Sequence, residues 1–227
     1  SATLNLGTDN AAAMVVSDTG AGVTDTLTIN ALKADDSFSA ENVTINGFET
    51  VNINVTAVDA DNVVGVFTIV GDPDADGVQT AATVNISGAG DFVFDTSDEF
   101  NIGAATGAGV IDASGLTGIF TMTDAAVGVR TITGGSGNDT IVSDNQENTL
   151  TGGAGDDNIT GGTSADTING GAGADTINGS TAAVGKYDTV SGGAGIDTFV
   201  YTDAQFDAAV TISGDDGVDI VSFADAS

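Results

Sequence analysis

Cysteine, histidine and tryptophan are absent from this chain, and proline occurs once, at Pro73. Without cysteine and histidine, the protein has no thiol nucleophile, no imidazole base and none of the nitrogen or sulfur ligands that usually hold zinc. Its available metal ligands are oxygen atoms, which suit hard cations such as Ca²⁺, Mg²⁺ or Mn²⁺. No apolar run is long enough to span a bilayer, so we do not expect membrane insertion.

Positive charge is almost absent as well. Three basic residues, Lys33, Arg130 and Lys186, stand against 33 acidic ones, which gives a formal net charge of −30. Such a chain has almost nothing with which to neutralise phosphate, so nucleic acid is not an expected partner. Self-repulsion of this size opposes compaction. The acids must therefore either spread over a wet surface or be neutralised by cations.

The residues that are present favour strands. Of the 227 residues, 41% are hydrophobic, and most of these are valine, isoleucine and alanine. Threonine, asparagine, aspartate and glycine make up most of the remainder. β-Branched residues placed between turn-forming residues are typical of short strands. We therefore expect an all-β protein.

Nine-residue repeats begin at Gly134. The units are GGSGNDTIV, SDNQENTLT, GGAGDDNIT, GGTSADTIN and GGAGADTIN, and GGAGIDTFV follows later from Gly192. Between them, a unit from Gly179 to Ser191 carries four extra residues, which predicts a bulging loop that includes Lys186 and Tyr187. A degenerate unit, GDDGVDIVS, starts at Gly214 after an irregular stretch, 203–209, that is a candidate helix. A fixed period of this kind indicates a stack of structural repeats.

Each position of the unit has a physical task. Glycines permit positive φ and bring backbone carbonyls close together, the sixth-position aspartate supplies a carboxylate, and the eighth-position apolar residue points inward. Two units make one coil, so units two apart stack about 4.8 Å from each other. One ladder is predicted to contain Asp139, Asp157, Asp175 and Asp197, and the other Asn148, Asp166 and Asp188. A divalent ion between stacked carboxylates turns their repulsion into attraction.

The repeat therefore predicts metal sites, with several Ca²⁺ ions. The ligand candidates are Gly135, Gly137, Asp139, Gly153, Gly155, Asp157, Gly162, Asp166, Gly171, Gly173, Asp175, Asp188, Gly193, Gly195 and Asp197. Unit 143–151 has lost its glycines and has Asn148 in place of aspartate, so we expect a weak or absent site there. The alternative is a glycine-rich solenoid in which the aspartates only cap turns. With one apolar side chain per unit, the core is thin, and folding should depend on metal binding.

Residues 1–133 lack the nine-residue period. Strands are predicted at 26–29, 43–45, 50–55, 66–70, 83–86, 92–94, 119–123 and 131–133. Alternation is clearest at 50–55, where Val51, Ile53 and Val55 share one face. We expect an irregular β-solenoid or a β-sandwich over 1–133, a right-handed parallel β-roll over 134–200, and a C-terminal flank of the roll over 201–227.

Two further acidic patterns occur in the sequence. Asp72, Asp74 and Asp76 precede Gly77 with the spacing of an EF-hand loop, but the bidentate glutamate is replaced by Thr83. They are candidates for an isolated Ca²⁺ loop, and a solvated acidic turn is the alternative. Adjacent pairs at 35–36 and 215–216 could do acid–base chemistry, yet nothing places them in a cleft. We therefore expect no enzymatic activity.

The nonapeptides resemble those of the RTX (repeats-in-toxin) proteins over residues 134–200. The segments 47–53, 111–118 and 130–135 resemble the Thr/Asn-rich β-segments of Gram-negative surface-layer proteins. The resemblance implies type I secretion, folding outside the cell in calcium, and a lattice in which calcium also bridges subunits. Since the chain starts at Ser1 and ends without an evident export signal, we expect it to be a fragment of a longer protein.

The first functional hypothesis is a calcium-dependent structural protein of a bacterial surface layer or filament, which assembles with itself and contacts cell-surface polysaccharide. Two alternatives remain open at this point. The chain could be part of an RTX adhesin that binds a glycan or a surface. It could also be the secretion and folding module of an enzyme whose catalytic domain lies elsewhere, because RTX units do not by themselves determine function.

Overall fold

The computed structural model describes residues 1–6, 14–17, 25–31, 42–55, 66–70, 82–94, 100–102, 109–123, 129–179, 187–202 and 210–224. Every regular element in these ranges is a strand. Within them, no helix has the length and apolar character needed to cross a membrane. The candidate helix at 203–209 and the inserted residues 180–186 lie outside the described residues.

The strands form three parallel sheets. The ten-stranded sheet contains β1 (Ala2–Leu6), β3 (Thr26–Ala31), β5 (Thr50–Val55), β7 (Thr83–Gly88), β10 (Gly109–Leu116), β12 (Val129–Thr133), β14 (Thr149–Ala154), β16 (Thr167–Ala172), β18 (Thr189–Ala194) and β20 (Thr211–Asp216). The four-stranded sheet contains β2 (Met14–Ser17), β4 (Asn42–Asn46), β6 (Val66–Val70) and β9 (Phe100–Ile102). The seven-stranded sheet contains β8 (Phe92–Phe94), β11 (Phe120–Met122), β13 (Thr140–Val142), β15 (Asn158–Thr160), β17 (Thr176–Asn178), β19 (Thr198–Thr202) and β21 (Ile220–Ala224).

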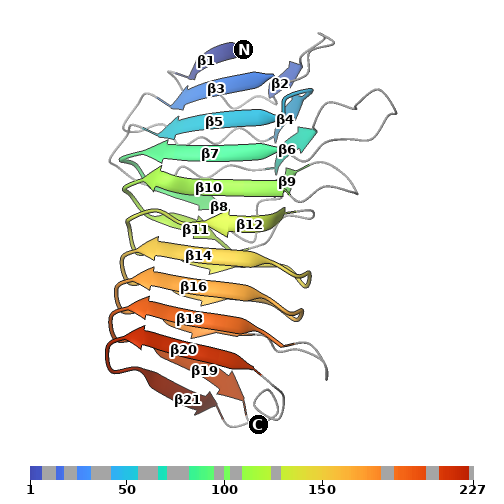
Figure 1. Cartoon of the computed structure of the whole chain (residues 1–227). Helices are drawn as coiled ribbons and strands as arrows, with labels where there is room; N and C mark the ends of the chain where they lie inside the picture. Colours follow the sequence, from blue (N-terminus) through green and yellow to red (C-terminus); the bar gives the residue numbers. More distant parts are fainter. Residues whose placement is uncertain are drawn as a thin grey trace.

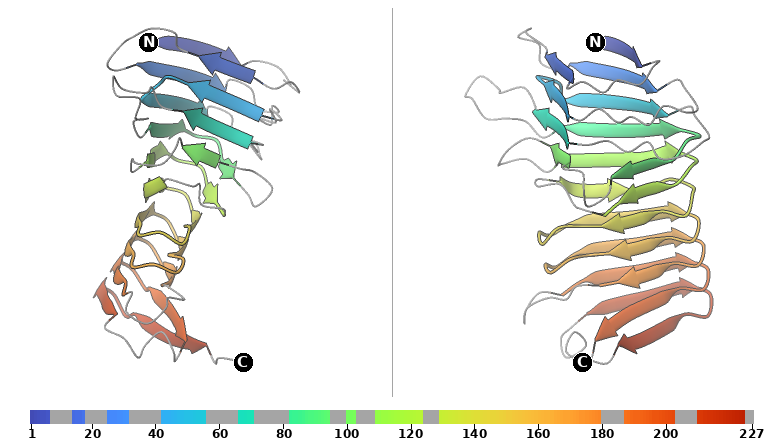
Figure 2. Two further views of the ribbon diagram at one scale, coloured as in Figure 1. Left: turned by 90° about the vertical axis from the view of Figure 1, so that its right-hand side faces the viewer. Right: turned by 180° about the vertical axis from the view of Figure 1, so that it is seen from behind.

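The chain is a parallel β-solenoid. It returns to the ten-stranded sheet once per coil, while the opposite wall passes from the four-stranded to the seven-stranded sheet. The coils stack along one axis, with the two termini at opposite ends (Figure 1). The view from behind shows the second wall, with β2, β4, β6 and β9 beside the N-terminal coils (Figure 2). The all-β prediction is confirmed, and of the two folds left open for the first half, the solenoid is the correct one.

All eight strands predicted in the first half coincide with strands of the structure, namely β3 to β8, β11 and β12. Four described strands of that half were missed: β1, β2, β9 and β10. The long strand β10 escapes a pattern search because its pairing with β7 shifts register between Asp112 and Gly115. Such an irregularity interrupts the alternation of inward and outward side chains on which a sequence-based prediction depends.

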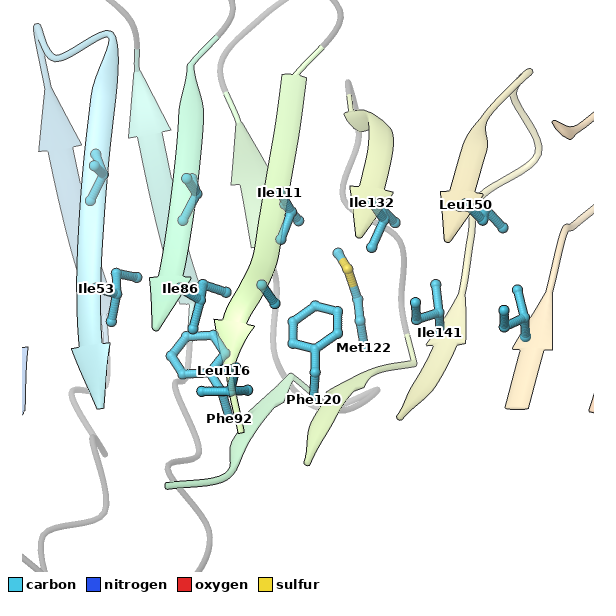
Figure 3. Close-up of a cluster of buried hydrophobic side chains, with 14 of the residues drawn as sticks. Ile53, Ile86, Phe92, Ile111, Leu116, Phe120, Met122, Ile132, Ile141 and Leu150 are labelled. Carbon is cyan, nitrogen blue, oxygen red and sulfur yellow. The ribbon is translucent and has the colours of Figure 1, made fainter. Parts of the chain in front are cut away.

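Two apolar columns face each other across the core. In the ten-stranded sheet, one column runs through Leu27, Val51, Val84, Ile111, Ile132, Leu150, Ile168, Val190 and Ile212. The column of the seven-stranded sheet runs through Met122, Ile141, Ile159, Ile177 and Phe199. Figure 3 shows Ile132 and Leu150 on one side and Met122 and Ile141 on the other. The eighth-position residues of the repeats therefore point inward, as predicted.

The depth of the apolar core falls along the axis. In β5 the alternate residues Val51, Ile53 and Val55 are all buried. In β14 the only large apolar residue that is buried is Leu150, and the next inward position is Gly152. Burying a large aliphatic side chain contributes roughly 1.5–3 kcal/mol, so a coil of the first half gains more from its core than a coil of the repeats.

Replacing Ile53 by alanine should therefore destabilise the first half whether or not metal is present. We expect a loss of about 2–5 kcal/mol, because the residue is fully buried and its removal leaves a cavity. Chemical denaturation in calcium and in chelator measures this loss in the free energy of unfolding. Thr50→Ala, an outward-facing control on the same strand, should change stability by less than about 1 kcal/mol. A loss seen only in calcium would contradict this description of the core.

Candidate metal centre

A stacked column of aspartates, the first ladder, lies in the turns that precede the strands of the seven-stranded sheet. Each backbone N–H in it donates to the carboxylate of the next coil: Asp139 to Asp157 Oδ1 at 2.7 Å, Asp157 to Asp175 Oδ1 at 2.8 Å, and Asp175 to Asp197 Oδ1 at 2.9 Å. The predicted stacking of these four residues is thus confirmed, including the step of 22 residues across the insertion.

A second ladder lies on the opposite side of the coils. The backbone N–H of Asn148 donates to Asp166 Oδ1 at 2.8 Å, and that of Asp166 donates to Asp188 Oδ1 at 2.9 Å. The next coil places Val210 at the corresponding register, because Thr189 pairs with Thr211. The second ladder therefore has two carboxylates, one on each of two adjacent coils.

Four carboxylate oxygens in these ladders are buried without a hydrogen-bond partner. They are the Oδ2 atoms of Asp157, Asp166, Asp175 and Asp197. The side chains themselves are at most 2% exposed. An unpaired polar atom in such a position costs about 1–3 kcal/mol, and more if it is charged. The free oxygens therefore create a strong demand for a positive partner.

Burial changes the ionisation of these acids. It raises the pKa of Asp157 and of Asp166 to about 7, and that of Asp175 to about 6, although backbone N–H bonds oppose the shift. Repulsion from neighbouring carboxylates adds to the rise, from Asp139 and Asp175 at Asp157 and from Asp188 at Asp166. The pKa of Asp197 is raised for the same reasons. Without a cation, these acids therefore keep their protons to a higher pH than exposed aspartates do.

The glycines bring the backbones of neighbouring coils close together. Gly171 has φ 120° and Gly173 has φ 138°, and a Cβ atom at either would lie about 2 Å from the carbonyl oxygen of the preceding coil. Among the predicted glycines, positive φ is found at Gly153, Gly155, Gly162, Gly171, Gly173, Gly193 and Gly195. Gly135 and Gly137 do not adopt it, which corrects the prediction for the first unit. The coil that precedes them is not a repeat. The backbone N–H of Ser136 donates to Leu116 O of that coil.

Unit 143–151 closes its turn with an amide. The Asn148 Nδ2 group donates to Asp144 Oδ1 at 3.0 Å and to Gln146 O at 2.7 Å. The NH₂ group thus bridges a carboxylate and a backbone carbonyl, which are both oxygen ligands of the type that Ca²⁺ binds. The amide thus occupies two oxygens of this turn, and the expectation of a weak or absent metal site here stays a prediction.

The degenerate last unit belongs to the first ladder, which sequence reasoning missed. The backbone N–H of Asp197 donates to Asp219 Oδ1 at 3.1 Å, so Asp219 is a fifth rung. Asp215 replaces the second glycine and still adopts a positive φ of 61°. Its carboxylate accepts hydrogen bonds from the hydroxyls of Ser191 and Ser213, which hold it in this conformation. The nine-residue alignment of GDDGVDIVS was the signal that could have identified Asp219.

Oxygen-rich turns of this kind fit a hard divalent cation. Each would combine one or two ladder carboxylates with glycine carbonyls, since no three acidic side chains converge on one point among the described residues. The buried Oδ2 atoms supply the negative charge, and the flexible glycine turns supply the carbonyls. The other candidate loop, with Asp72, Asp74 and Asp76, lies outside the described residues.

A comparison with known families points to the same segment. The model of the RTX calcium-binding nonapeptide repeat, which covers four copies, matches residues 131–150 and 151–181. No curated protein matches the chain. The family match covers the first rungs of both ladders, while Asp188, Asp197 and Asp219 lie beyond it.

The raised pKa values predict that acid stabilises the metal-free repeats. A carboxyl group whose pKa is higher in the folded than in the unfolded state binds more protons when folded, so stability is present at low pH and is lost as pH rises through the folded value. In chelator, the repeats should be more ordered near pH 5 than near pH 8, as circular dichroism can measure. In calcium the trend should reverse, because protons compete with the ion. The same pH dependence in both conditions would contradict this account.

Asn148→Asp should make the first coil dependent on metal. The substitution removes the donated hydrogen bonds and places a second carboxylate beside Asp144, so the thermal midpoint in chelator should fall. Calcium should restore the thermal midpoint, so the rise in midpoint that calcium causes should be larger than in the natural chain. Asn145→Asp adds the same charge at an exposed position of this turn and should leave that shift nearly unchanged. An equal shift in the two variants would contradict the role assigned to the amide.

Proposed function

Residues 131–181 are RTX calcium-binding nonapeptide repeats, and from that premise we propose that the chain is a calcium-dependent structural protein of a bacterial surface layer or filament. Calcium folds the repeats, and the folded solenoid assembles with other copies. The observation that carries the proposal is the set of buried, unpartnered carboxylate oxygens in the two ladders. They make an ordered repeat segment depend on a cation that is abundant outside cells.

An extracellular location follows from the same chemistry. Proteins with RTX repeats are typically secreted, and type I secretion exports a chain unfolded before calcium orders it. Sites with one or two carboxylates and glycine carbonyls suit the weak, millimolar class of calcium affinity that extracellular modules have. The later repeats of such a chain would stay unfolded at the low free calcium inside a cell and fold after export.

A structural role is supported by the outer surface of the ten-stranded sheet. One outward column runs through Thr26, Thr50, Thr83, Val110, Thr131, Thr149, Thr167, Thr189 and Thr211, and none of these residues is charged. In a chain of net charge −30, this uncharged column allows two copies to approach with less repulsion than elsewhere, and Asp112 is an acid of the next outward column. The same hydroxyl-rich face is suited to a neutral polysaccharide of the cell surface. We assign no catalytic role to the chain.

Electron microscopy with sedimentation tests the assembly. The chain should form filaments or sheets in millimolar calcium and return to single, partly unfolded molecules in chelator. An Asp157→Asn/Asp175→Asn double variant should not assemble in calcium, whereas Asn158→Ala, an exposed change on the same coil, should assemble normally. Single molecules at every calcium concentration would overturn the structural role. If those molecules bound a glycan, the adhesin hypothesis would take its place.

A further inference from the structure

One interior column changes its chemistry where the repeats begin. Phe92 pairs with Phe120, and the register of β11 with β13 places Phe120 beside Asp139. Asp157 follows on the next coil. All four side chains are buried, so a column of phenyl rings continues directly as a column of carboxylates. Figure 3 shows the Phe120 ring beside Met122 and the Phe92 ring beside Leu116, one coil further from the repeats.

The first carboxylate of the column is bonded differently from the others. Asp139 Oδ1 accepts the backbone N–H of Phe120 at 2.8 Å, and Asp139 Oδ2 accepts that of Gly135 at 2.6 Å. Both oxygens are thus satisfied by protein groups, whereas the Oδ2 atoms of Asp157, Asp175 and Asp197 are buried without a partner. Asp139 thus joins the apolar stack to the repeats with both of its carboxylate oxygens bonded to backbone N–H groups.

The other half of the same coil is also satisfied by the protein. Asn148 fills its turn with an amide that bridges Asp144 Oδ1 and Gln146 O. Neither Gly135 nor Gly137 adopts the positive φ that marks the turns of the later coils. Like each later coil, this coil carries an apolar pair, Ile132 and Ile141, but here the pair packs against the first half. The bonding of Asp139, the amide of Asn148 and the backbone of Gly135 and Gly137 are therefore the three features that separate residues 129–151 from the coils that follow.

We propose that residues 129–151 form a seed coil that is ordered without metal, and that calcium adds the later coils to it one after another toward the C-terminus. The proposal rests on calcium binding by the later coils, but not on the assembly of copies. In a repeat stack, each unit gains stability mainly from its neighbour. A coil with few apolar contacts and a glycine-rich backbone is costly to order alone and becomes stable when it docks on a coil already formed.

The seed coil removes the need for a nucleation event among ion-dependent coils. It presents the N–H groups of Asp139 and Asn148 to the next coil, and these donate to Asp157 and Asp166. The first incoming carboxylates therefore find preformed donors. Each completed coil then offers the same donors to its successor, as the N–H groups of Asp157 and Asp166 do for Asp175 and Asp188.

Hydrogen exchange measured by mass spectrometry along a calcium titration of the full chain tests the proposal. Without metal, peptides from residues 82–123 and 129–151 should be protected, and peptides from 158–202 should exchange freely. As calcium rises, protection should appear first near β15 and last near β19 and β21. If residues 129–151 exchanged freely in chelator while 82–123 stayed protected, the seed coil would not be ordered without metal and the proposal would be wrong. Calcium-dependent folding of the repeats would still hold.

Three matched variants reveal the direction of growth. Asp139→Ala should raise the calcium midpoint of every later coil about tenfold or more, because it removes two buried charge-assisted bonds at the joint. Asp175→Ala should affect β17 and β19 but spare β15, and Asp197→Ala should leave both β15 and β17 within about twofold of the natural chain. Protection of 82–123 reports that each variant keeps its first half. If Asp197→Ala raised the calcium midpoint of all coils and Asp139→Ala raised only that of its own coil, the coils would form from the C-terminal end and the proposal would be wrong.

Discussion

The stacking of buried carboxylates is the constraint on which the rest of this structure depends. Parallel coils place identical positions about 4.8 Å apart, so one aspartate per unit becomes a column of aspartates in the interior. Such a column is unfavourable unless protons or cations neutralise it, as the raised pKa values of Asp157, Asp166 and Asp175 express. The glycines, the short strands and the thin core are compatible with a stable fold only if that neutralisation occurs.

The solenoid meets this constraint in two ways along one axis. Its first half fills the interior with aliphatic and aromatic side chains, up to three per strand. Its second half keeps a single buried apolar residue in most strands, with Tyr201 beside Phe199 in β19 as a second one, and adds oxygen-lined turns. The two parts share one sheet and one apolar column, so the repeats stack directly on a part with a deeper apolar core. The join at Phe120 and Asp139 is where one type of stabilisation replaces the other.

The ladders were predictable because a period of nine residues determines which residues stack, whatever the detailed conformation. The same reasoning identified Asn148 as an exception. It could not reveal that the amide closes the turn, since that depends on where Asp144 and Gln146 O lie. The first half has no period, so the strands were found from alternation but not the stacking of Phe92 and Phe120 under Asp139. Strand β10 was missed because a register shift hides its alternation.

The central claim is that cations neutralise the buried ladder oxygens. Anomalous diffraction from crystals of the full chain grown in calcium, or in terbium as a stronger scatterer, measures this directly. The account predicts ions beside the Oδ2 atoms of Asp157, Asp166, Asp175 and Asp197. Ordered coils in which these four oxygens have no ion beside them, at millimolar calcium and neutral pH, would contradict it.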